Sequence, residues 1–195
     1  MTKEEIKQLV GENPLILEIG CADGTDTKEL MKIGTVYGFE PEPKNIAILE
    51  TIKGINLFQG AVGNSDSQVV FNRSSTDNPN ALSLSGSIMK PKNHLKRWDW
   101  IFFKEQLVVN CVRLDTFCKD MPLIDFIWCD AQGAEEQIIL GGSETLKKTR
   151  YFYTEYGNDE QYQDQPTLER ILGLLPNFEI VKDYKTDILL RNKKL

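Results

Sequence analysis

The sequence predicts an α/β fold built on a parallel sheet, and three observations support this. Short apolar runs that are typical of buried strands alternate with stretches whose apolar residues have helical spacing. A glycine loop follows the first run, and acidic residues follow later ones. The resulting βαβαβ order implies parallel strands joined by right-handed crossovers. With 195 residues, the chain suits a single domain, residues 1–195, with one core.

The N-terminal part alternates strands and helices. Thr2 and Glu5 have the T-x-x-E form of a capping box, which predicts a short helix to about Val10. Glycines and prolines then separate the elements. We expect a strand at 15–19, a helix at 25–33 capped by Thr25 or Asp26, a strand at 35–39, a helix at 44–53 and a strand at 55–58.

The middle of the chain contains a long polar stretch. Strands are expected at 68–72 and 107–114, and a short helical turn at 115–117. Between the strands, the sequence is rich in Ser, Asn, Pro, Lys and Arg and has little periodicity. A loop of this length in a compact domain is typical of a lid, a binding loop or a disordered segment. We expect residues 73–103 to form a lid or an acceptor-binding loop.

The C-terminal part returns to alternating elements. Gly141 and Gly142 interrupt an otherwise amphipathic helix, so we expect them to weaken or kink it. The expected elements are a strand at 124–129, a helix at 135–148, a strand at 151–154, a helix at 167–174 and a hairpin of 178–182 with 186–190.

Composition excludes several classes of protein. The net charge of −6 argues against a nucleic-acid partner, because phosphate binding requires a basic surface. No apolar run reaches about 18 residues, so no membrane span is expected, and the polar N-terminus predicts a cytoplasmic protein. Because C-x-x-C spacing is absent, we expect buried free thiols rather than a zinc or redox site at Cys21, Cys111, Cys118 and Cys129.

The glycine loop predicts the kind of ligand. A strand, a glycine loop and a helix start place backbone N–H groups against an anionic group, and glycine allows a close approach. Gly20 and Gly24 give the pattern E-x-G-x-x-x-G instead of the G-x-G-x-x-G that a dinucleotide requires. An acid such as Glu18 can pair with an ammonium group. The loop therefore suits S-adenosylmethionine better than NAD.

Acidic residues follow three of the expected strands, at Glu40, Asp130 and Glu155. Ligands of an open parallel sheet bind outside the carboxyl ends of its strands, so these residues should share one edge. Glu40 follows the glycine loop by about 20 residues, a spacing at which an acid can accept both hydroxyls of a ribose. The spacing predicts an adenosine-containing cofactor.

Four segments carry a resemblance to a known family: L-E-I-G-C-A-D-G-T at 17–25, F-E-P-E-P-K-N at 39–45, G-A-V-G-N-S at 60–65 and D-F-I-W-C-D-A-Q-G-A-E at 125–135. The chain resembles the FkbM-type S-adenosylmethionine-dependent methyltransferases over roughly residues 15–155. The resemblance implies a class I methyltransferase fold, a Rossmann-like three-layer sandwich whose seven-stranded, mostly parallel sheet has an antiparallel C-terminal strand. It also implies methyl transfer to oxygen, often on sugars or natural products.

Two positions depart from the family pattern. Glu18 stands where the family usually has Asp, and Trp128 and Cys129 replace the more common Lys and Ile or Val before the acid. Glu18, Gly20 and Asp23 are expected to hold the amino-acid end of the cofactor, Glu40 the ribose, and Gly60 to Val62 the adenine. The expected cofactor-binding residues are Glu18, Gly20, Asp23, Glu40, Pro41, Gly60, Ala61, Val62, Asp130 and Gln132.

Asp130 is the first candidate for the general base, because it ends the strand that should face the methyl group. An alcohol is a weak nucleophile, so a base or a metal near its hydroxyl would help. Glu155 is the second catalytic candidate and Gln132 a neighbour. Two carboxylates and an amide would also suit Mg²⁺ or Mn²⁺. The alternative for Asp130 is a helix N-cap.

His94, the only histidine, is the third catalytic candidate. It lies in a basic run, residues 90–97, within the expected lid. The alternative is a solvated loop residue. The run itself is either a solvated surface or a dock for a phosphate or an acidic glycan. Trp98 and Trp100 are expected to anchor the core or the lid, or to form a platform for a sugar ring.

Together these features predict an S-adenosylmethionine-dependent O-methyltransferase that acts on a hydroxyl group of a sugar or glycan. A natural-product hydroxyl is an alternative acceptor. A non-catalytic interaction module with the same fold is a second alternative, which the retained acids argue against. The missing third glycine argues against an NAD-linked oxidoreductase, and the absence of an N/D-P-P-Y/F motif argues against a nucleic-acid methyltransferase.

Overall fold

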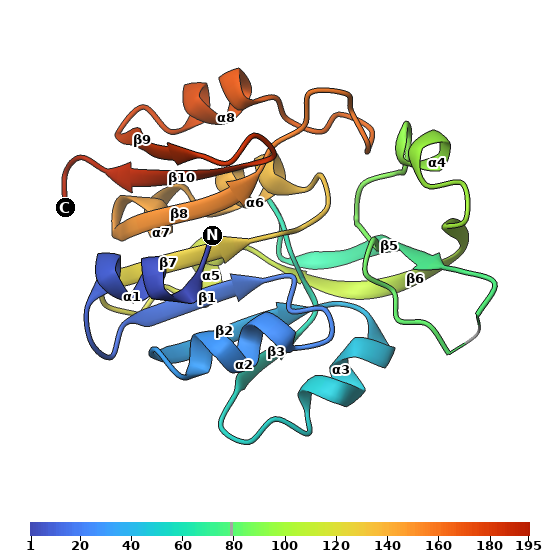
Figure 1. Ribbon diagram of the computed structural model, residues 1–195, viewed down its shortest axis with the longest axis horizontal. Coiled ribbons are helices and arrows are strands. Elements are labelled where there is room, and N and C mark those ends of the chain that lie inside the picture. The colour runs from blue at the N-terminus through green and yellow to red at the C-terminus, as the bar shows by residue number, and fades with distance from the viewer. Residues whose placement is uncertain (79) are drawn as a thin grey trace.

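A seven-stranded sheet forms the centre of the computed structural model, which describes residues 1–78 and 80–195. The strands lie in the order β3-β2-β1-β7-β8-β10-β9 (Figure 1). Their bounds are β1 Leu15–Ile19, β2 Thr35–Glu40, β3 Asn56–Gln59, β7 Ile124–Cys129, β8 Thr149–Glu155, β9 Phe178–Asp183 and β10 Asp187–Asn192. β1 pairs in parallel with β2 and β7, whereas β10 is antiparallel to β8 and β9. This is the sheet expected for a class I methyltransferase fold.

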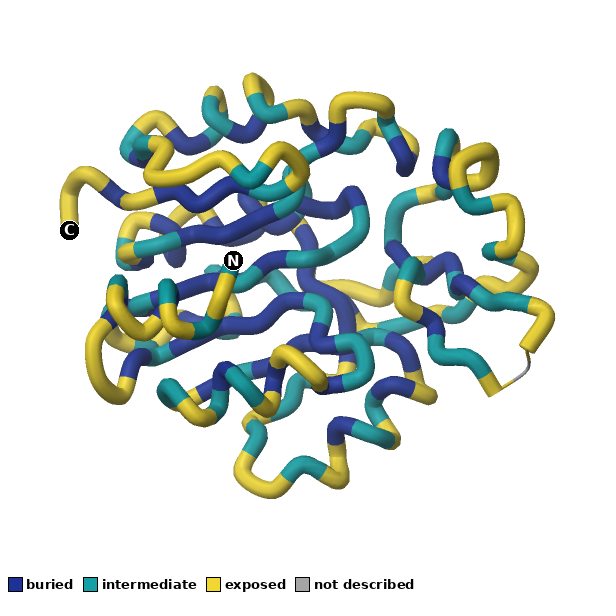
Figure 2. The backbone as a smooth tube through the Cα atoms, viewed as in Figure 1, coloured by how far each residue is buried: buried dark blue, intermediate teal, exposed yellow. Residues whose placement is uncertain are grey.

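Helices cover both faces of this sheet, giving three layers (Figure 1). Alternate residues of β1 face opposite layers, as the period of a strand requires: Ile16 packs with α1 and α2, whereas Leu17 packs with α5 to α7. The buried strands between the helical layers form the core (Figure 2). The helices are α1 Lys3–Val10, α2 Thr25–Met31, α3 Pro43–Leu49, α5 Leu114–Phe117, α6 Glu135–Gly141, α7 Ser143–Lys147 and α8 Leu168–Leu174.

A second, three-stranded sheet lies beside the large one (Figure 1). It consists of β4 (Ala61–Val62), β6 (Phe102–Val112) and β5 (Ser67–Ser75), in that order. β5 and β6 form a long antiparallel ladder from Ser67 with Cys111 to Ser75 with Phe102. The predicted loop at 73–103 is therefore shorter at both ends. It also contains a short helix, α4 (His94–Arg97). Strand pairing and packing give regular structure to residues whose sequence has no periodicity.

The observed helix ends agree with the predicted ones at some positions and differ at others. The capping box of α1 is confirmed: Glu5 N–H donates to Thr2 Oγ1 at 3.2 Å, and Thr2 N–H donates to Glu5 Oε2 at 2.7 Å. The predicted cap of α2 is wrong. Gly24 is the N-cap residue, with φ +76°, and the Asp23 carboxylate accepts the Thr25 N–H at 2.9 Å.

The predicted helix at 135–148 is two helices, α6 and α7, which meet at Gly142. Close packing around the glycine pair leaves no room for a side chain. A Cβ on Gly141 would stand 1.9 Å from the Gly63 carbonyl oxygen, so any side chain would push α6 away from the segment after β4.

All four cysteines are buried free thiols, as expected. Within residues 1–78 and 80–195, we find no helix with the length and apolar character needed to cross a membrane.

Candidate functional site

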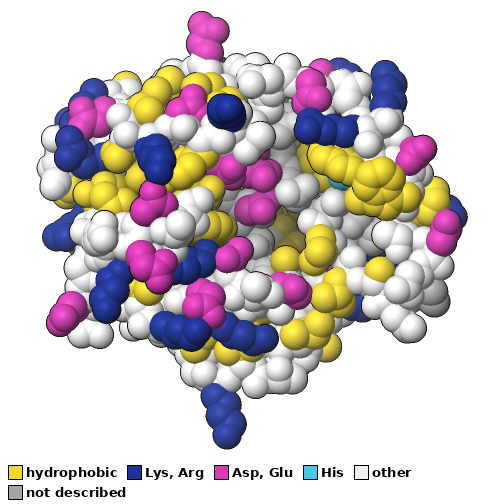
Figure 3. Space-filling model, viewed as in Figure 1, with side chains coloured by type: hydrophobic (Ala, Val, Ile, Leu, Met, Phe, Trp, Pro, Cys, Tyr) yellow, Lys and Arg dark blue, Asp and Glu magenta, His cyan; other side chains and the backbone are white. Residues whose placement is uncertain are grey.

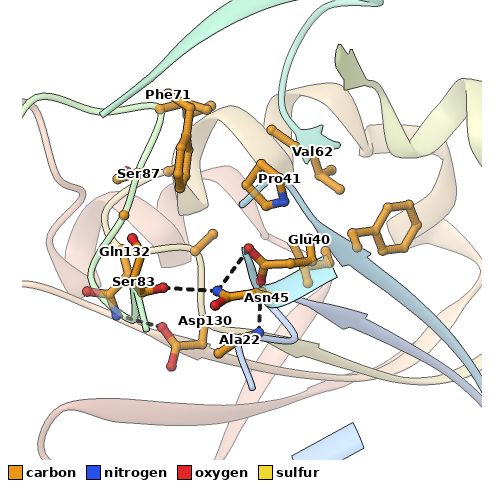
Figure 4. Close-up of a pocket in the computed structure, with 18 of the residues that line it drawn as sticks. Ala22, Glu40, Pro41, Asn45, Val62, Phe71, Ser83, Ser87, Asp130 and Gln132 are labelled. Carbon is orange, nitrogen blue, oxygen red and sulfur yellow. Dashed lines mark hydrogen bonds between the residues drawn. The ribbon is translucent and has the colours of Figure 1, made fainter. Parts of the chain in front are cut away.

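A pocket opens at the carboxyl ends of β1, β2 and β7 (Figure 4). The loop after β1, the end of β2, β4 and the loop after β7 form most of its wall, and the segment between β5 and β6 completes it. Figure 3 shows acidic side chains gathered around a hollow in the middle of the face seen there. The predicted shared edge is therefore confirmed for Glu40 and Asp130, which both line this pocket.

Gly20 allows two loops to touch at the base of the pocket. Its φ is +89°, and a Cβ there would stand 2.0 Å from the Asp130 carbonyl oxygen. The Gly20 N–H donates to the Phe39 carbonyl at 3.0 Å, which ties the loop to β2. Ala22 also has a positive φ, +49°, and its N–H points to the end of β2. The lack of a Cβ at Gly20 thus serves a contact between two segments of backbone, and the close approach of this loop to a ligand stays a prediction.

Glu40 is the centre of the pocket's polar wall. Its carboxylate accepts the Ala22 N–H at 2.8 Å, the Glu42 N–H at 2.9 Å and the Asn45 amide at 3.3 Å. Burial raises the pKa of Glu40 to about 7. A carboxylate has about four lone-pair sites, so these three bonds leave room for a hydroxyl of a ligand.

Asn45 adds a second acceptor to the same wall. Its Nδ2 donates to Glu40 and, at 2.9 Å, to the Ser83 carbonyl (Figure 4). Its Oδ1 is buried and has no hydrogen-bond partner among the residues described. A buried acceptor without a partner costs about 1–3 kcal/mol, and a ribose hydroxyl would satisfy it. These two acceptors therefore fit the hydroxyl groups of the ribose of an adenosine-containing cofactor.

The rest of the pocket is largely apolar. Pro41 lines it together with Gly60, Ala61 and Val62, the three residues predicted to border the adenine. Phe71 of β5 faces them across the pocket (Figure 4). An apolar slot of this kind suits a flat aromatic base.

Asp130 and Glu155 form an interacting carboxyl pair beside the pocket. Gln132 Nε2 donates to Asp130 Oδ1 at 2.7 Å and lies 3.5 Å from Glu155 Oε2. Burial raises the pKa of Asp130, and burial together with the charge of Asp130 raises the pKa of Glu155 to about 9. Two interacting carboxyl groups do not both ionise readily, so Asp130 and Glu155 titrate as a coupled pair.

Glu135 supports the loop that carries this pair. It is fully buried and accepts the Ala131 N–H at 3.3 Å and the Gly133 N–H at 3.2 Å. Burial raises the pKa of Glu135 to about 7. Asp130 is not a helix cap, because Ala134 is the N-cap residue of α6.

Two predicted cofactor residues do not line the pocket. Glu18 shares its face of β1 with Ile16 and points toward the layer of α1 and α2, whereas the pocket is lined by Ile19 on the other face. Burial raises the pKa of Glu18 to about 7. Asp23 supports the start of α2. Their roles in cofactor binding stay predictions.

His94 is not a solvated loop residue. It is 2% exposed, and its ring packs against Trp98, Phe103 and Tyr162. Burial lowers the pKa of His94, which favours the neutral ring. It lies outside the pocket and faces a second cavity. Trp100, in contrast, is 57% exposed and anchors neither core nor lid.

Two of the four Lys and Arg residues in the basic run at 90–97 form salt bridges with the segment that follows β8. Lys92 forms a salt bridge with Glu160, and Arg97 forms one with Asp159 at 3.5 Å. These contacts favour a structural role for Lys92 and Arg97 over a dock for phosphate.

Several site residues were missed by sequence reasoning. Asn45 is the last residue of the segment F-E-P-E-P-K-N at 39–45, and its place in that family motif could have identified it as a site residue. Phe71 and Ser83 come from β5 and the segment after it, where no motif marks them. Tyr162 places its hydroxyl 2.8 Å from Gln132 Oε1 and 2.8 Å from the Ser85 carbonyl, and nothing local in the sequence predicts either contact.

The expectation of Mg²⁺ or Mn²⁺ gains no support from the structure. Over the described ranges, no three or more His, Cys, Asp and Glu side chains form a group that could hold a metal ion.

Comparison with known proteins places the chain among methyltransferases. A family model, methyltransferase FkbM domain, matches residues 18–184. The chain is 39% identical over 207 residues to the 2-O-methyltransferase NoeI of Sinorhizobium fredii, an alignment that covers 99% of this chain and 85% of that protein.

Two solved structures share the fold. An rRNA methylase from Streptococcus thermophilus is 9% identical with a TM-score of 0.53, over 97% of this chain and 93% of that one. A SAM-dependent methyltransferase from Anabaena variabilis is 12% identical with a TM-score of 0.53, over 97% and 81%. At these identities, the likeness concerns the fold alone.

Proposed function

The chain belongs to the FkbM family of methyltransferases, and on that basis we propose that it transfers a methyl group from S-adenosylmethionine to a hydroxyl oxygen of a sugar or glycan. The observation that carries the proposal is the carboxyl pair of Asp130 and Glu155 beside the pocket that contains Glu40. The name of the relative from S. fredii, a 2-O-methyltransferase, supports oxygen as the atom that accepts the methyl group.

Glu40 and Asn45 bind the ribose in this proposal. The Glu40 carboxylate accepts one hydroxyl, and the unpartnered Asn45 Oδ1 accepts another. Gly60, Ala61 and Val62 form the wall against the adenine, opposite Phe71. The Gly20 and Ala22 loop and the Asp130 loop, which meet through their backbones, enclose the amino-acid end.

When bound, S-adenosylmethionine supplies an electrophilic methyl carbon. The bond between this carbon and the acceptor oxygen forms as the carbon–sulfur bond breaks, and the electron pair of the broken bond stays on sulfur. The acceptor's proton passes to the carboxyl pair, in which Glu155 faces the second cavity and Asp130 faces the cofactor pocket. Gln132 orients Asp130 through its amide at 2.7 Å. Alignment of the reacting groups and removal of the proton both lower the barrier.

Calorimetric titration with S-adenosylmethionine and S-adenosylhomocysteine tests the cofactor assignment. We expect binding in the micromolar range. Transfer of a labelled methyl group to a panel of sugars and glycans then tests the reaction, with MgCl₂, MnCl₂ or a chelator added in parallel to test the metal expectation. An absence of binding to both cofactors under all conditions would contradict the proposal and favour the interaction-module alternative.

A further inference from the structure

A second cavity of about 650 Å³ adjoins the cofactor pocket. It lies between the end of β8, helix α4 and the turn between β9 and β10. Gln132 and Leu84 line both spaces, so they form the partition between them. The volume lies within the range of small-molecule sites.

Two buried side chains of this cavity lack hydrogen bonds in the described part of the chain. Gln161 is 8% exposed, and neither its Nε2 nor its Oε1 has a partner. His94 Nδ1 also has none. A buried polar group without a partner costs about 1–3 kcal/mol. A hydroxyl group both donates and accepts, so a ligand with several hydroxyls can satisfy both atoms of the Gln161 amide.

The charges around this cavity balance. The charged side chains in its lining are two basic ones, Arg97 and Lys185, and two acidic ones, Asp159 and Glu155. Glu155 and Asp130 together count as one negative charge, because two interacting carboxyl groups do not both ionise readily. Arg97 and Asp159 pair with each other at 3.5 Å. A cavity without a net charge offers little to a phosphate or a uronic acid, so its lining favours a neutral ligand.

The cavity lining also contains apolar side chains and a carboxyl group. Trp98, Ile101 and Tyr156 line it and offer the kind of surface that packs against the C–H face of a sugar ring. Glu155 also lines the cavity and interacts with Asp130, which lines the cofactor pocket. A hydroxyl placed beside Glu155 is thus close to both the base and the cofactor pocket.

We propose that this second cavity binds the methyl acceptor as a neutral sugar ring and that the Gln161 amide recognises its hydroxyl groups. The assignment rests on the proposed function, because it takes the ligand of this cavity to be the acceptor of that reaction.

The test compares wild type with Gln161→Leu, which removes both hydrogen-bonding atoms at similar volume. Gln163→Leu is the matched control, because Gln163 is exposed and does not line the cavity. The probes are the methyl glycosides of glucose, galactose and fucose, with methyl glucuronide and glucose 6-phosphate as charged counterparts. Saturation-transfer NMR in the presence of S-adenosylhomocysteine measures sugar binding, and labelled methyl transfer measures KM.

We expect wild type to bind one or more neutral sugars in preference to the charged ones. Gln161→Leu should raise the Kd and KM for the sugar roughly 10- to 100-fold, the effect of losing about two hydrogen bonds. Its affinity for S-adenosylhomocysteine should not change. Its unfolding midpoint should stay equal or rise, because the amide it removes has no partner in the free protein. Gln161→Met, which keeps the length of the side chain, provides a second variant should Gln161→Leu fold poorly.

Three outcomes would overturn the assignment: equal sugar affinity in wild type and the Gln161 variants, binding of the charged probes alone, and binding of none of the probes by protein that binds S-adenosylhomocysteine. Failure of wild type to bind S-adenosylhomocysteine would instead contradict the proposed function itself. The calorimetric titration therefore separates the two failures.

Discussion

Gly20 and Asp130 meet through their backbones at the base of the pocket. The Asp130 N–H donates to the Ile19 carbonyl at 3.0 Å, and the Asp130 carbonyl oxygen lies 2.0 Å from where a Cβ on Gly20 would stand. The contact holds the loop after β1 against the loop after β7. It thereby brings the wall that contains Glu40 and the carboxyl of Asp130 to one pocket.

Gly20→Ala should destabilise the protein by roughly 2–4 kcal/mol, because the left-handed backbone costs about 1 kcal/mol and the clash adds about 1–3 kcal/mol. Gly54→Ala is the matched control: its φ of +88° is nearly that of Gly20, +89°, but its Cβ would meet only Met31 Cε, at 3.6 Å. Urea unfolding measures both. An equal loss of stability in the two variants would mean that backbone strain, and not the contact with Asp130, requires glycine at position 20.

Glu40→Ala should weaken the binding of S-adenosylhomocysteine by about 1–3 kcal/mol, the usual effect of losing hydrogen bonds to a charged group. Glu50→Ala, which removes an exposed acid that follows α3, is the control and should bind normally. Calorimetry gives the affinities, and unfolding curves show whether the Ala22 loop stays folded without its carboxylate partner. Unchanged affinity in Glu40→Ala would remove this residue from the ribose site.

Asp130→Asn should reduce methyl transfer by about 10²- to 10⁴-fold, the range that a general base contributes, and leave cofactor affinity largely intact. The substitution keeps the shape of the side chain but removes the charge that accepts a proton. Asp120→Asn changes an exposed acid and should leave the rate unchanged. Single-turnover measurements with bound cofactor separate the chemical step from binding, and a normal rate in Asp130→Asn would exclude Asp130 as the base.

The stability of the free protein should fall as the pH rises from about 5 to 8. Burial raises the pKa of Glu18, Glu40 and Glu135 to about 7 from the ordinary 4.5. In that interval the native state binds more protons than the unfolded state, so raising the pH destabilises it.

Glu135→Gln should remove roughly 2–3 kcal/mol of this fall, since one unit of pKa corresponds to about 1.4 kcal/mol and most of the rise in the pKa of Glu135 lies within the interval. The amide oxygen can still accept the Ala131 and Gly133 N–H groups, so the fold of the loop is kept. Glu136→Gln is the control, because the pKa of Glu136 is lowered by Arg170 and its charge is present throughout the interval. Urea unfolding between pH 5 and 8 gives the slopes, and parallel slopes for wild type and Glu135→Gln would contradict the assignment.

Local patterns were enough to predict most of the large sheet. The apolar runs predicted every strand of the large sheet to within two residues at each end. Buried strands at its centre, such as β1 and β7, need a continuous apolar segment. The same logic placed Glu40 and Asp130 at one edge, since parallel strands present their carboxyl ends together. The strand bounds of the β5–β6 ladder were less accurate, because cross-strand pairing extends both strands beyond their apolar centres.

Long-range packing set the remaining features of the site. The face to which Glu18 turns, the burial of His94 and the contact between Tyr162 and Gln132, 30 residues apart, all depend on segments that meet only in the folded chain. Periodicity and spacing describe neighbours along the chain, so they identify the strand on which an acid lies and the edge at which it ends. They carry no information on which distant loop covers that edge. In this protein, the loop that covers the edge determines which polar groups have no partner in the protein and can bind a ligand.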